Sequence, residues 1–184
     1  FNSWHGEKIH GSHYLLTEVL KERMGFDGLV VGDWNGHGQI KGCTNKSCPQ
    51  AMNAGLDVYM VPTSAWKPLY ENLIKQVKSG DILQSRLDDA VSRVLGVKLR
   101  AGIFDKPSPS NRPHANKTEL IGSPAHRAVA REAVRKSLVL LKNDEHILPL
   151  TGKQHYLVTG SGADNIGTQS GGWSVTWQGT GNVN

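Results

Sequence analysis

The sequence predicts an α/β protein in which the strands of a parallel sheet alternate with helical crossovers. Two short apolar runs, residues 29–31 and 56–61, are typical of buried strands, and segments with helical spacing flank both of them. Residues 105–122 are rich in proline, serine and asparagine and have little to bury. That composition is typical of a linker, and it predicts a second unit after it.

Helices are predicted before, between and after the two strands. Ser12 is placed to cap the first helix and Gly25 to end it. A short second helix covers about residues 49–53, and Gly80 and Gly102 end two longer helices that follow the second strand. The side chains at helical spacing are Leu15, Leu16, Val19 and Leu20 in the first helix, Tyr70, Leu73, Ile74 and Val77 in the third, and Leu87, Val91, Val94, Leu95 and Leu99 in the fourth.

The second unit is predicted to begin at Ser123, because a capping serine followed by Pro124 is a helix start. The helix is expected to run to about Lys142, and a strand is expected at residues 155–159. The apolar stripe of this helix is Val134, Leu138 and Leu141. Residues 160–184 are rich in glycine. Their Gly160-Ser161-Gly162 turn lacks the third glycine of the dinucleotide fingerprint and no helical pattern follows, so nucleotide binding is not favoured.

Composition excludes several partners. The 184 residues carry 21 Lys and Arg against 16 Asp and Glu, a formal net charge of +5 that is spread along the chain. Arg127, Arg131 and Arg135 repeat at four-residue spacing, but a solvated or interdomain helix face explains them, so no nucleic acid is expected as a partner. No apolar run approaches the roughly 18 residues that span a bilayer, so no membrane is expected either. The chain opens with Phe1 and lacks a start methionine, and we therefore expect a piece excised from a longer protein.

Asp33 is the candidate reactive carboxylate. It stands with Trp34 where the first strand stops, and parallel α/β architectures place catalysis at the carboxyl ends of strands. The alternative is that Asp33 caps a turn and Trp34 only packs. Hydrolysis of a glycosidic bond needs a second carboxylate about 5–5.5 Å away in a retaining enzyme. Asp57 begins the second strand, about 13 Å from Asp33 if the strands are parallel, and is expected to be structural. Asp27 fails in the same way, so the chain is expected to hold one half of a carboxylate pair.

Aromatic residues are a second indication of a sugar ligand, because sugar rings stack their apolar faces on indole rings. Trp34 suits this role, and so do Trp173 and Trp177, although a tryptophan in a glycine-rich segment is also a common core residue. No histidine pattern indicates a metal site, and none is expected. Cys43 and Cys48 either close a small disulfide loop or stay free thiols.

The run Gly-Phe-Asp-Gly-Leu-Val-Val-Gly-Asp-Trp at residues 25–34 resembles the nucleophile segment of glycoside hydrolase family 3, the β-glucosidase and exo-β-glucanase family. Four further stretches, residues 1–4, 54–57, 131–143 and 171–177, are similar to the family in the same order. The resemblance extends over essentially the whole chain.

This resemblance implies the C-terminal part of a (β/α)8 TIM barrel for residues 1–105, an interdomain linker for 106–122 and the start of an α/β sandwich domain for 123–184. It implies that Asp33 is the nucleophile that forms a glycosyl-enzyme intermediate, and that Trp34 and Trp177, with Trp173 beside them, contact the sugar.

The implied substrate is a β-glucoside or gluco-oligosaccharide, the implied location is secreted or periplasmic, and neither a cofactor nor an oligomeric state is implied. The family's acid/base glutamate and most glucose-holding residues would lie outside these residues, so we expect the chain alone to be inactive and poorly soluble. The alternative from another class is a non-catalytic carbohydrate-binding module on the same fold.

Overall fold

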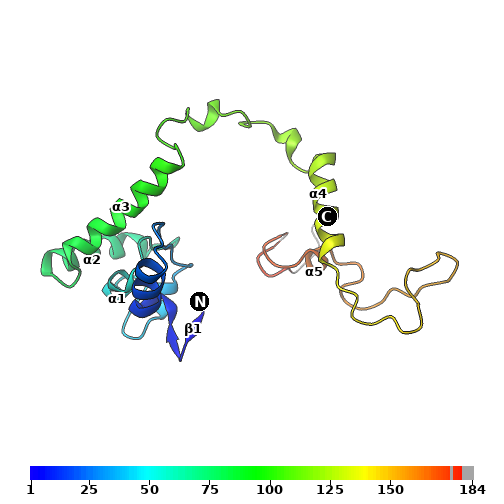
Figure 1. The fold of residues 1–184 in the computed structure, drawn as a ribbon, viewed down its shortest axis with the longest axis horizontal. Coiled ribbons are helices and arrows are strands. Elements are labelled where there is room, and N and C mark those ends of the chain that lie inside the picture. Colours follow the sequence, from blue (N-terminus) through cyan, green and yellow to red (C-terminus); the bar gives the residue numbers. More distant parts are fainter. Residues whose placement is uncertain (175, 180–184) are drawn as a thin grey trace. The chain divides into compact units, whose positions relative to one another are not determined.

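A computed structural model describes residues 1–174 and 176–179 (Figure 1). The chain divides into two compact units, Phe1–Lys117 and Thr118–Asn184. The elements of the first unit are β1 Ser3–Trp4, β2 Glu7–Lys8, η1 Ile9–Gly11, η2 Tyr14–Arg23, η3 Gly36–Gln39, α1 Pro49–Ala54, α2 Trp66–Ser79, α3 Gln84–Arg100 and η4 Pro109–Asn111. Those of the second unit are η5 Thr118–Leu120, α4 Pro124–Ser137 and α5 Ile166–Ser170.

The first predicted helix is present, but it is wound as a π-helix, η2. The Met24 N–H donates to the Val19 carbonyl at 3.0 Å, which is the i to i−5 spacing of that wider helix. Ser12 caps its first turn as expected, since the hydroxyl accepts from the Leu15 N–H at 3.3 Å. Gly25 follows the helix with φ of 65°, a backbone conformation that glycine adopts without strain, so the predicted end is confirmed.

The two predicted strands pair in parallel, as expected, but over fewer residues. Val31 and Val58 form a parallel bridge, the Gly32 N–H donates to the Val58 carbonyl at 2.8 Å, and the Val58 N–H donates to the Val30 carbonyl at 3.1 Å. We call residues 30–32 and 57–60 the strand pair. Within the described residues the regular ladder is confined to the β1–β2 hairpin, and the strand pair is joined by the isolated bridge between Val31 and Val58.

The core of the first unit packs α1 against the strand pair. Cys48, Ala51 and Leu56 are its buried centre, and Leu56 is 1% exposed. Burying a side chain of that size stabilises the fold by roughly 2 kcal/mol. Partly buried side chains surround this centre: Val30, Ile40, Cys43 and Tyr59. The second strand is therefore held from one face by a short helix that immediately precedes it.

The later helices of the first unit agree with their predicted ends. α2 ends before Gly80, which has φ of 87°, and α3 ends at Arg100, two residues before Gly102. Residues 105–122 contain turns and the short 3₁₀-helices η4 and η5, and the boundary between the two units falls among them. None of the helices in the described part of the chain combines the length and apolar character needed to cross a bilayer.

The second unit differs from expectation in three places. α4 begins as predicted, with the Ser123 hydroxyl 3.4 Å from the His126 N–H, but it ends at Ser137 instead of near Lys142. The reason is that residues 138–141 are consecutive apolar residues, a pattern of extended chain, and Leu138 has extended backbone angles.

The strand predicted at residues 155–159 is absent, because these residues find no hydrogen-bonded neighbour within the described ranges 1–174 and 176–179. The expectation that no helix follows Gly162 was also wrong. α5 forms at Ile166–Ser170, where the Asn165 side chain accepts from the Thr168 N–H at 2.9 Å.

Candidate active site

Asp33 lies directly after the strand pair, at its carboxyl end. The last bond of the pair is from the Asn35 N–H to the Met60 carbonyl at 2.9 Å, so the chain at Asp33 is still held beside the second strand. The Asp33 side chain is 50% exposed, and Trp34 beside it is 55% exposed. The structure therefore leaves an accessible carboxylate and an accessible indole next to each other, on the loop position where parallel α/β folds place reacting groups.

The contacts of Asp33 are made with backbone nitrogens and one ring. Its Oδ1 accepts from the Trp34 N–H at 2.6 Å, and the Phe1 nitrogen lies 4.0 Å from its Oδ2. Its own N–H donates to His10 Nε2 at 3.0 Å. The carboxylate itself is thus oriented by one hydrogen bond, from the backbone of the next residue.

The loop after Trp34 turns sharply. Asn35 has φ of 52°, in the left-handed region, and the Gly36 N–H donates back to the Asp33 carbonyl at 2.9 Å. His37 in η3 is 1% exposed, its Nε2 is 3.1 Å from the Asn45 carbonyl, and its ring meets Tyr59 edge-on at 5.0 Å. The loop is thus anchored in the core four residues after Asp33.

Tyr59 connects this anchor to α1. Its hydroxyl donates to the Cys48 carbonyl at 2.7 Å and accepts from the Met52 N–H at 3.1 Å. Burial raises the pKa of Tyr59, so the phenol stays protonated and keeps donating. The sequence analysis missed this residue, because an aromatic in a strand is normally interpreted as packing alone.

Cys43 and Cys48 form a disulfide, with 4.8 Å between their Cα atoms. Of the two interpretations of these cysteines, the bonded one holds in the structure. The Thr44 N–H donates to the Ser47 carbonyl at 2.9 Å inside the closed loop, and the Asn72 amide of α2 donates to the Lys46 carbonyl at 2.9 Å. The disulfide loop is therefore fixed to α2 as well as to the core.

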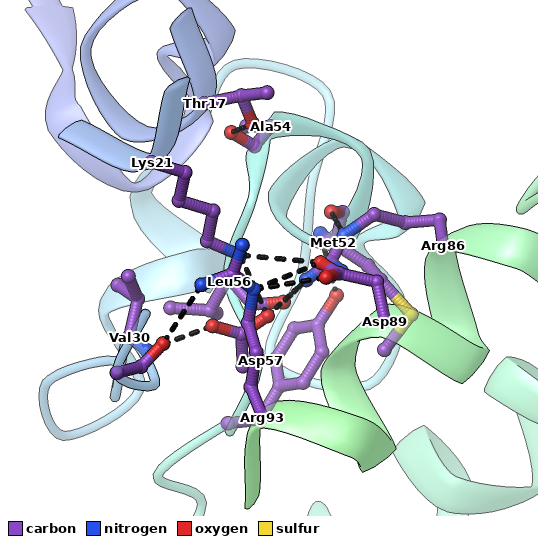
Figure 2. Close-up of polar contacts among 12 residues, drawn as sticks. Thr17, Lys21, Val30, Met52, Ala54, Leu56, Asp57, Arg86, Asp89 and Arg93 are labelled. Carbon is purple, nitrogen blue, oxygen red and sulfur yellow. Dashed lines mark hydrogen bonds and ion pairs between the residues drawn. The ribbon is translucent and has the colours of Figure 1, made fainter. Parts of the chain in front are cut away.

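Asp57 occupies the opposite, amino end of the strand pair and has a different environment. Its side chain is fully buried, Oδ1 accepts from Lys21 Nζ at 2.8 Å and from Arg86, and Oδ2 accepts from the Val30 N–H at 2.8 Å. Figure 2 shows Lys21 of η2 and Arg86 of α3 beside it, and Asp89 of α3 pairs in turn with Lys21, Arg86 and Arg93. Each carboxylate oxygen is engaged, so Asp57 has the structural role that its position predicted.

The cations around Asp57 also bind the backbone. Arg86 donates to the Met52 carbonyl at 2.9 Å and the Leu56 carbonyl at 3.0 Å, and Arg93 donates to the Phe26 and Gly28 carbonyls at 2.8 and 3.0 Å. Burial lowers the pKa of Lys21, while its bond to Asp57 opposes that shift. This network ties η2, α1 and α3 to the start of both runs of the strand pair.

In the second unit, Trp173 and Trp177 lie together. Their ring centroids are 6.0 Å apart at an interplanar angle of 86°, and the Trp173 N–H donates to the Trp177 carbonyl at 3.1 Å. The two side chains are 83% and 65% exposed, so neither is the buried core residue of the alternative interpretation. A Cβ on Gly172 would lie 2.9 Å from the Trp177 carbonyl oxygen, so this close turn requires glycine there.

No cluster of three or more His, Cys, Asp or Glu side chains among residues 1–174 and 176–179 is arranged to hold a metal ion. His10 and His37 are instead hydrogen-bonded to backbone groups. In the described chain, the helix that follows the Gly160 turn is α5. It has five residues, so the dipole at its amino end is too small to argue for a phosphate site.

An exposed carboxylate and an exposed indole thus lie side by side at the carboxyl end of the strand pair, and comparison with known proteins shows the family to which the chain belongs. The profile described as "Glycosyl hydrolase family 3 N terminal domain" matches residues 1–97. The chain therefore belongs to glycoside hydrolase family 3, whose N-terminal domain is a TIM-barrel type of fold.

Similar proteins are named as glycosidases. The chain is 36% identical over 182 residues to a lysosomal beta glucosidase of Dictyostelium discoideum and 33% identical over 184 residues to a periplasmic beta-glucosidase of Salmonella typhimurium. Each alignment covers 95% of this chain, but 22% and 23% of those proteins. The chain thus spans less than a quarter of the length of these two relatives.

Solved structures give the same family. An exo-1,3/1,4-beta-glucanase (ExoP) from a Pseudoalteromonas species superimposes with a TM-score of 0.89 at 54% identity, over 100% of this chain and 23% of that one. A beta-glucosidase from Listeria innocua superimposes with a TM-score of 0.60 at 29% identity, over 77% of this chain and 20% of that one.

Proposed function

We propose that this chain forms part of a retaining β-glucosidase that removes terminal β-D-glucosyl residues from gluco-oligosaccharides. The observation that supports this most is the accessible Asp33 carboxylate at the carboxyl end of a parallel strand pair, with Trp34 beside it. Membership of family 3 and the names of the relatives give the same reaction class.

In this proposal Asp33 is the nucleophile. Its carboxylate attacks the anomeric carbon while a general acid protonates the leaving glycosidic oxygen, which gives a covalent glucosyl ester on Asp33. Water then attacks the same carbon, the ester bond breaks, and glucose leaves with its configuration retained. The reaction calls for no cofactor or metal.

The domain assignment follows the resemblance. Residues 1–105 would be the C-terminal part of the barrel, 106–122 the interdomain linker and 123–184 the beginning of the α/β sandwich domain. The acid/base glutamate would lie outside residues 1–184, and the chain alone would then be inactive. The low share of each relative that is covered agrees with this assignment.

The proposed sugar contacts are aromatic. Trp34 would stack on the sugar next to the one that Asp33 attacks, and Trp177, with Trp173 beside it, would contribute from the sandwich domain. All three indoles are exposed, as ligand contact requires. A secreted or periplasmic location is proposed, in line with the periplasmic relative.

The test is to replace Asp33 by alanine in the full-length protein and to measure hydrolysis of 4-nitrophenyl β-D-glucoside. Loss of the nucleophile is expected to lower kcat on the order of 10⁴-fold, while the matched control Asp27→Ala keeps the wild-type rate. Asp27 is 83% exposed at its side chain and lies on the same segment, before the strand pair.

A 2-deoxy-2-fluoro-β-D-glucosyl fluoride label, mapped by peptide mass spectrometry, should be found on Asp33. A label on another residue would contradict the assignment. Glucan binding without any turnover by the full-length protein would instead favour the non-catalytic carbohydrate-binding module.

A further inference from the structure

His10 touches the backbone of the candidate nucleophile. The Asp33 N–H donates to His10 Nε2 at 3.0 Å. A backbone N–H is always a donor, so Nε2 must be the unprotonated acceptor nitrogen and the ring proton sits on Nδ1. The bond therefore exists only while His10 is neutral.

The same ring lies against the chain on both sides of Asp33. A Cβ built on Gly36 would lie 2.6 Å from His10 Cε1, a separation that side chains do not adopt, and one built on Gly32 would lie 3.5 Å from His10 Cδ2. The absence of a side chain at Gly36 lets the imidazole approach the loop this closely. His10 thus fixes the segment from residue 32 to residue 36 by one hydrogen bond and by packing.

Several contacts hold His10 itself in place. It sits in η1, where the Ile9 N–H donates to the Asn2 carbonyl at 3.2 Å and Gly11 packs closely on the Ile40 side chain. The hairpin before η1 is fixed to η2 by Trp4, which stacks on Tyr14 with ring centroids 5.6 Å apart and an interplanar angle of 16°. The imidazole is therefore presented to Asp33 by anchored structure.

Asp33 needs such support. Its carboxylate is half exposed, and the contacts described above for it are with the Trp34 and Phe1 backbone nitrogens. The orientation of the carboxylate then depends on the backbone that carries it. A displacement of about 1 Å at a reacting group costs on the order of 100-fold in rate.

We propose that His10 is a positioning residue for Asp33: its neutral imidazole holds the backbone of residues 32–36, so that the carboxylate faces the anomeric carbon in one orientation. The proposal rests on the proposed function, because it gives His10 a role only if Asp33 reacts. His10 itself neither touches the sugar nor transfers a proton.

The electrostatic surroundings keep the ring neutral. Burial lowers the pKa of His10, and His37 and the positive charge of Lys8 act in the same direction. The carboxylate of Asp33 opposes them. Protonation at acid pH would turn Nε2 into a donor and remove the bond to the Asp33 N–H.

The test uses three variants of the full-length protein. His10→Leu fills similar space without an acceptor, His10→Gln offers an amide oxygen as acceptor, and His13→Leu is the matched control, since His13 is exposed and pairs with Glu18 at 3.5 Å. We expect His10→Leu to lower kcat on the order of 100-fold with KM changed by less than about threefold. The kcat of His10→Gln should be at least about tenfold higher than that of His10→Leu, and His13→Leu should have the kcat of the wild type.

A pH profile separates positioning from a structural role. Wild-type kcat should fall on the acid side as His10 gains its proton, and His10→Gln should lack that step. The proposal would be overturned if His10→Leu kept the kcat of the wild type, or if His10→Leu and His10→Gln lowered kcat equally. If His10→Leu does not fold, the pH profile of His10→Gln decides: a kcat that falls at the same acid pH as in the wild type would overturn the proposal. Unchanged turnover in Asp33→Ala would instead overturn the proposed function itself.

Discussion

The two ends of the strand pair hold one aspartate each, and the two environments are opposites. Asp57, at the amino end, is fully buried, and both of its oxygens are engaged by Lys21, Arg86 and the Val30 N–H. Asp33, at the carboxyl end, is half exposed, and its carboxylate accepts a hydrogen bond from the Trp34 N–H. The separation along the strands is about 10 Å, three residues at ~3.3 Å each.

Under the proposed function, one short piece of sheet thus holds a stabilising aspartate at one end and a reactive one at the other. At the amino end the network of Asp57 joins three helices to both strands, which removes freedom from the start of each strand. At the carboxyl end the carboxylate is left open, and its geometry is set indirectly by His10, His37 and the disulfide loop. A carboxylate held this way stays exposed to solvent while its backbone is fixed.

The largest expected effect comes from making the same substitution at both ends. Asp33→Asn should lower kcat on the order of 10⁴-fold and leave the thermal unfolding midpoint where it is. Asp57→Asn should cost on the order of 3 kcal/mol of the free energy of unfolding, because Lys21 and Arg86 then keep only the part-exposed carboxylate of Asp89 as an anion. Steady-state kinetics and denaturant unfolding of the full-length protein measure both. If the two variants lowered kcat and the free energy of unfolding by equal amounts, the two aspartates would not have the different roles proposed for them.

The disulfide belongs to the carboxyl end but should behave as a structural feature. It closes a loop with a sequence separation of five, and the chain-entropy relation gives about 2 kcal/mol for a loop of that length. The double variant Cys43→Ser/Cys48→Ser should lose about that much unfolding free energy. Its KM should stay close to the wild-type value when the kinetics are measured below the lowered unfolding temperature. A kcat as low as that of Asp33→Asn would show that the loop takes part in the reaction.

Trp34 gives a smaller effect, on binding rather than on the chemical step. Trp34→Ala should raise KM for a disaccharide about fivefold, because an aromatic stacking contact contributes roughly 1 kcal/mol. Trp66→Ala is the matched control, since Trp66 is 59% exposed against 55% for Trp34 and lies on α2. Equal KM values for the two variants would argue against a sugar contact at Trp34.

The smallest expected effect is the pH dependence that His10 gives to stability. Its native pKa is lowered below the usual 6.5, chiefly by burial, so below that pH the unfolded chain binds a proton that the native protein does not. Stability should therefore fall as pH drops from about 6.5 through the native pKa of His10. Thermal unfolding midpoints of the wild type and His10→Gln are to be compared from pH 7 to pH 4.5. Between these two pH values the midpoint should fall further in the wild type than in His10→Gln. Parallel curves would contradict the assignment.

Part of this architecture was readable from local pattern. Caps and breakers such as Ser12, Gly25, Gly80 and Ser123 ended or began helices where expected, because they act through nearest-neighbour backbone geometry. Asp57 was recognised as structural from its place at the start of a strand. The late end predicted for α4 and the predicted strand at 155–159 failed, because contiguous apolar residues acquire regular structure only with a partner to pack on or pair with.

The contacts that define the candidate site could not be read in this way. Asp33 and Trp34 stood out because they end an apolar run, whereas His10 lies 23 positions earlier with no spacing that marks it. Nor does any pattern indicate that Lys21 and Arg86 meet at Asp57, across separations of 36 and 29 residues.

By itself, then, the sequence determined the helix limits of the first unit, the parallel pairing of its two strands and the position of the candidate carboxylate at a strand end, since these depend on local propensity and on the pattern of apolar residues. The tertiary structure alone decided which groups support that carboxylate and which bury the other one, because hydrogen bonds and ion pairs between distant residues exist only after the chain has closed on itself.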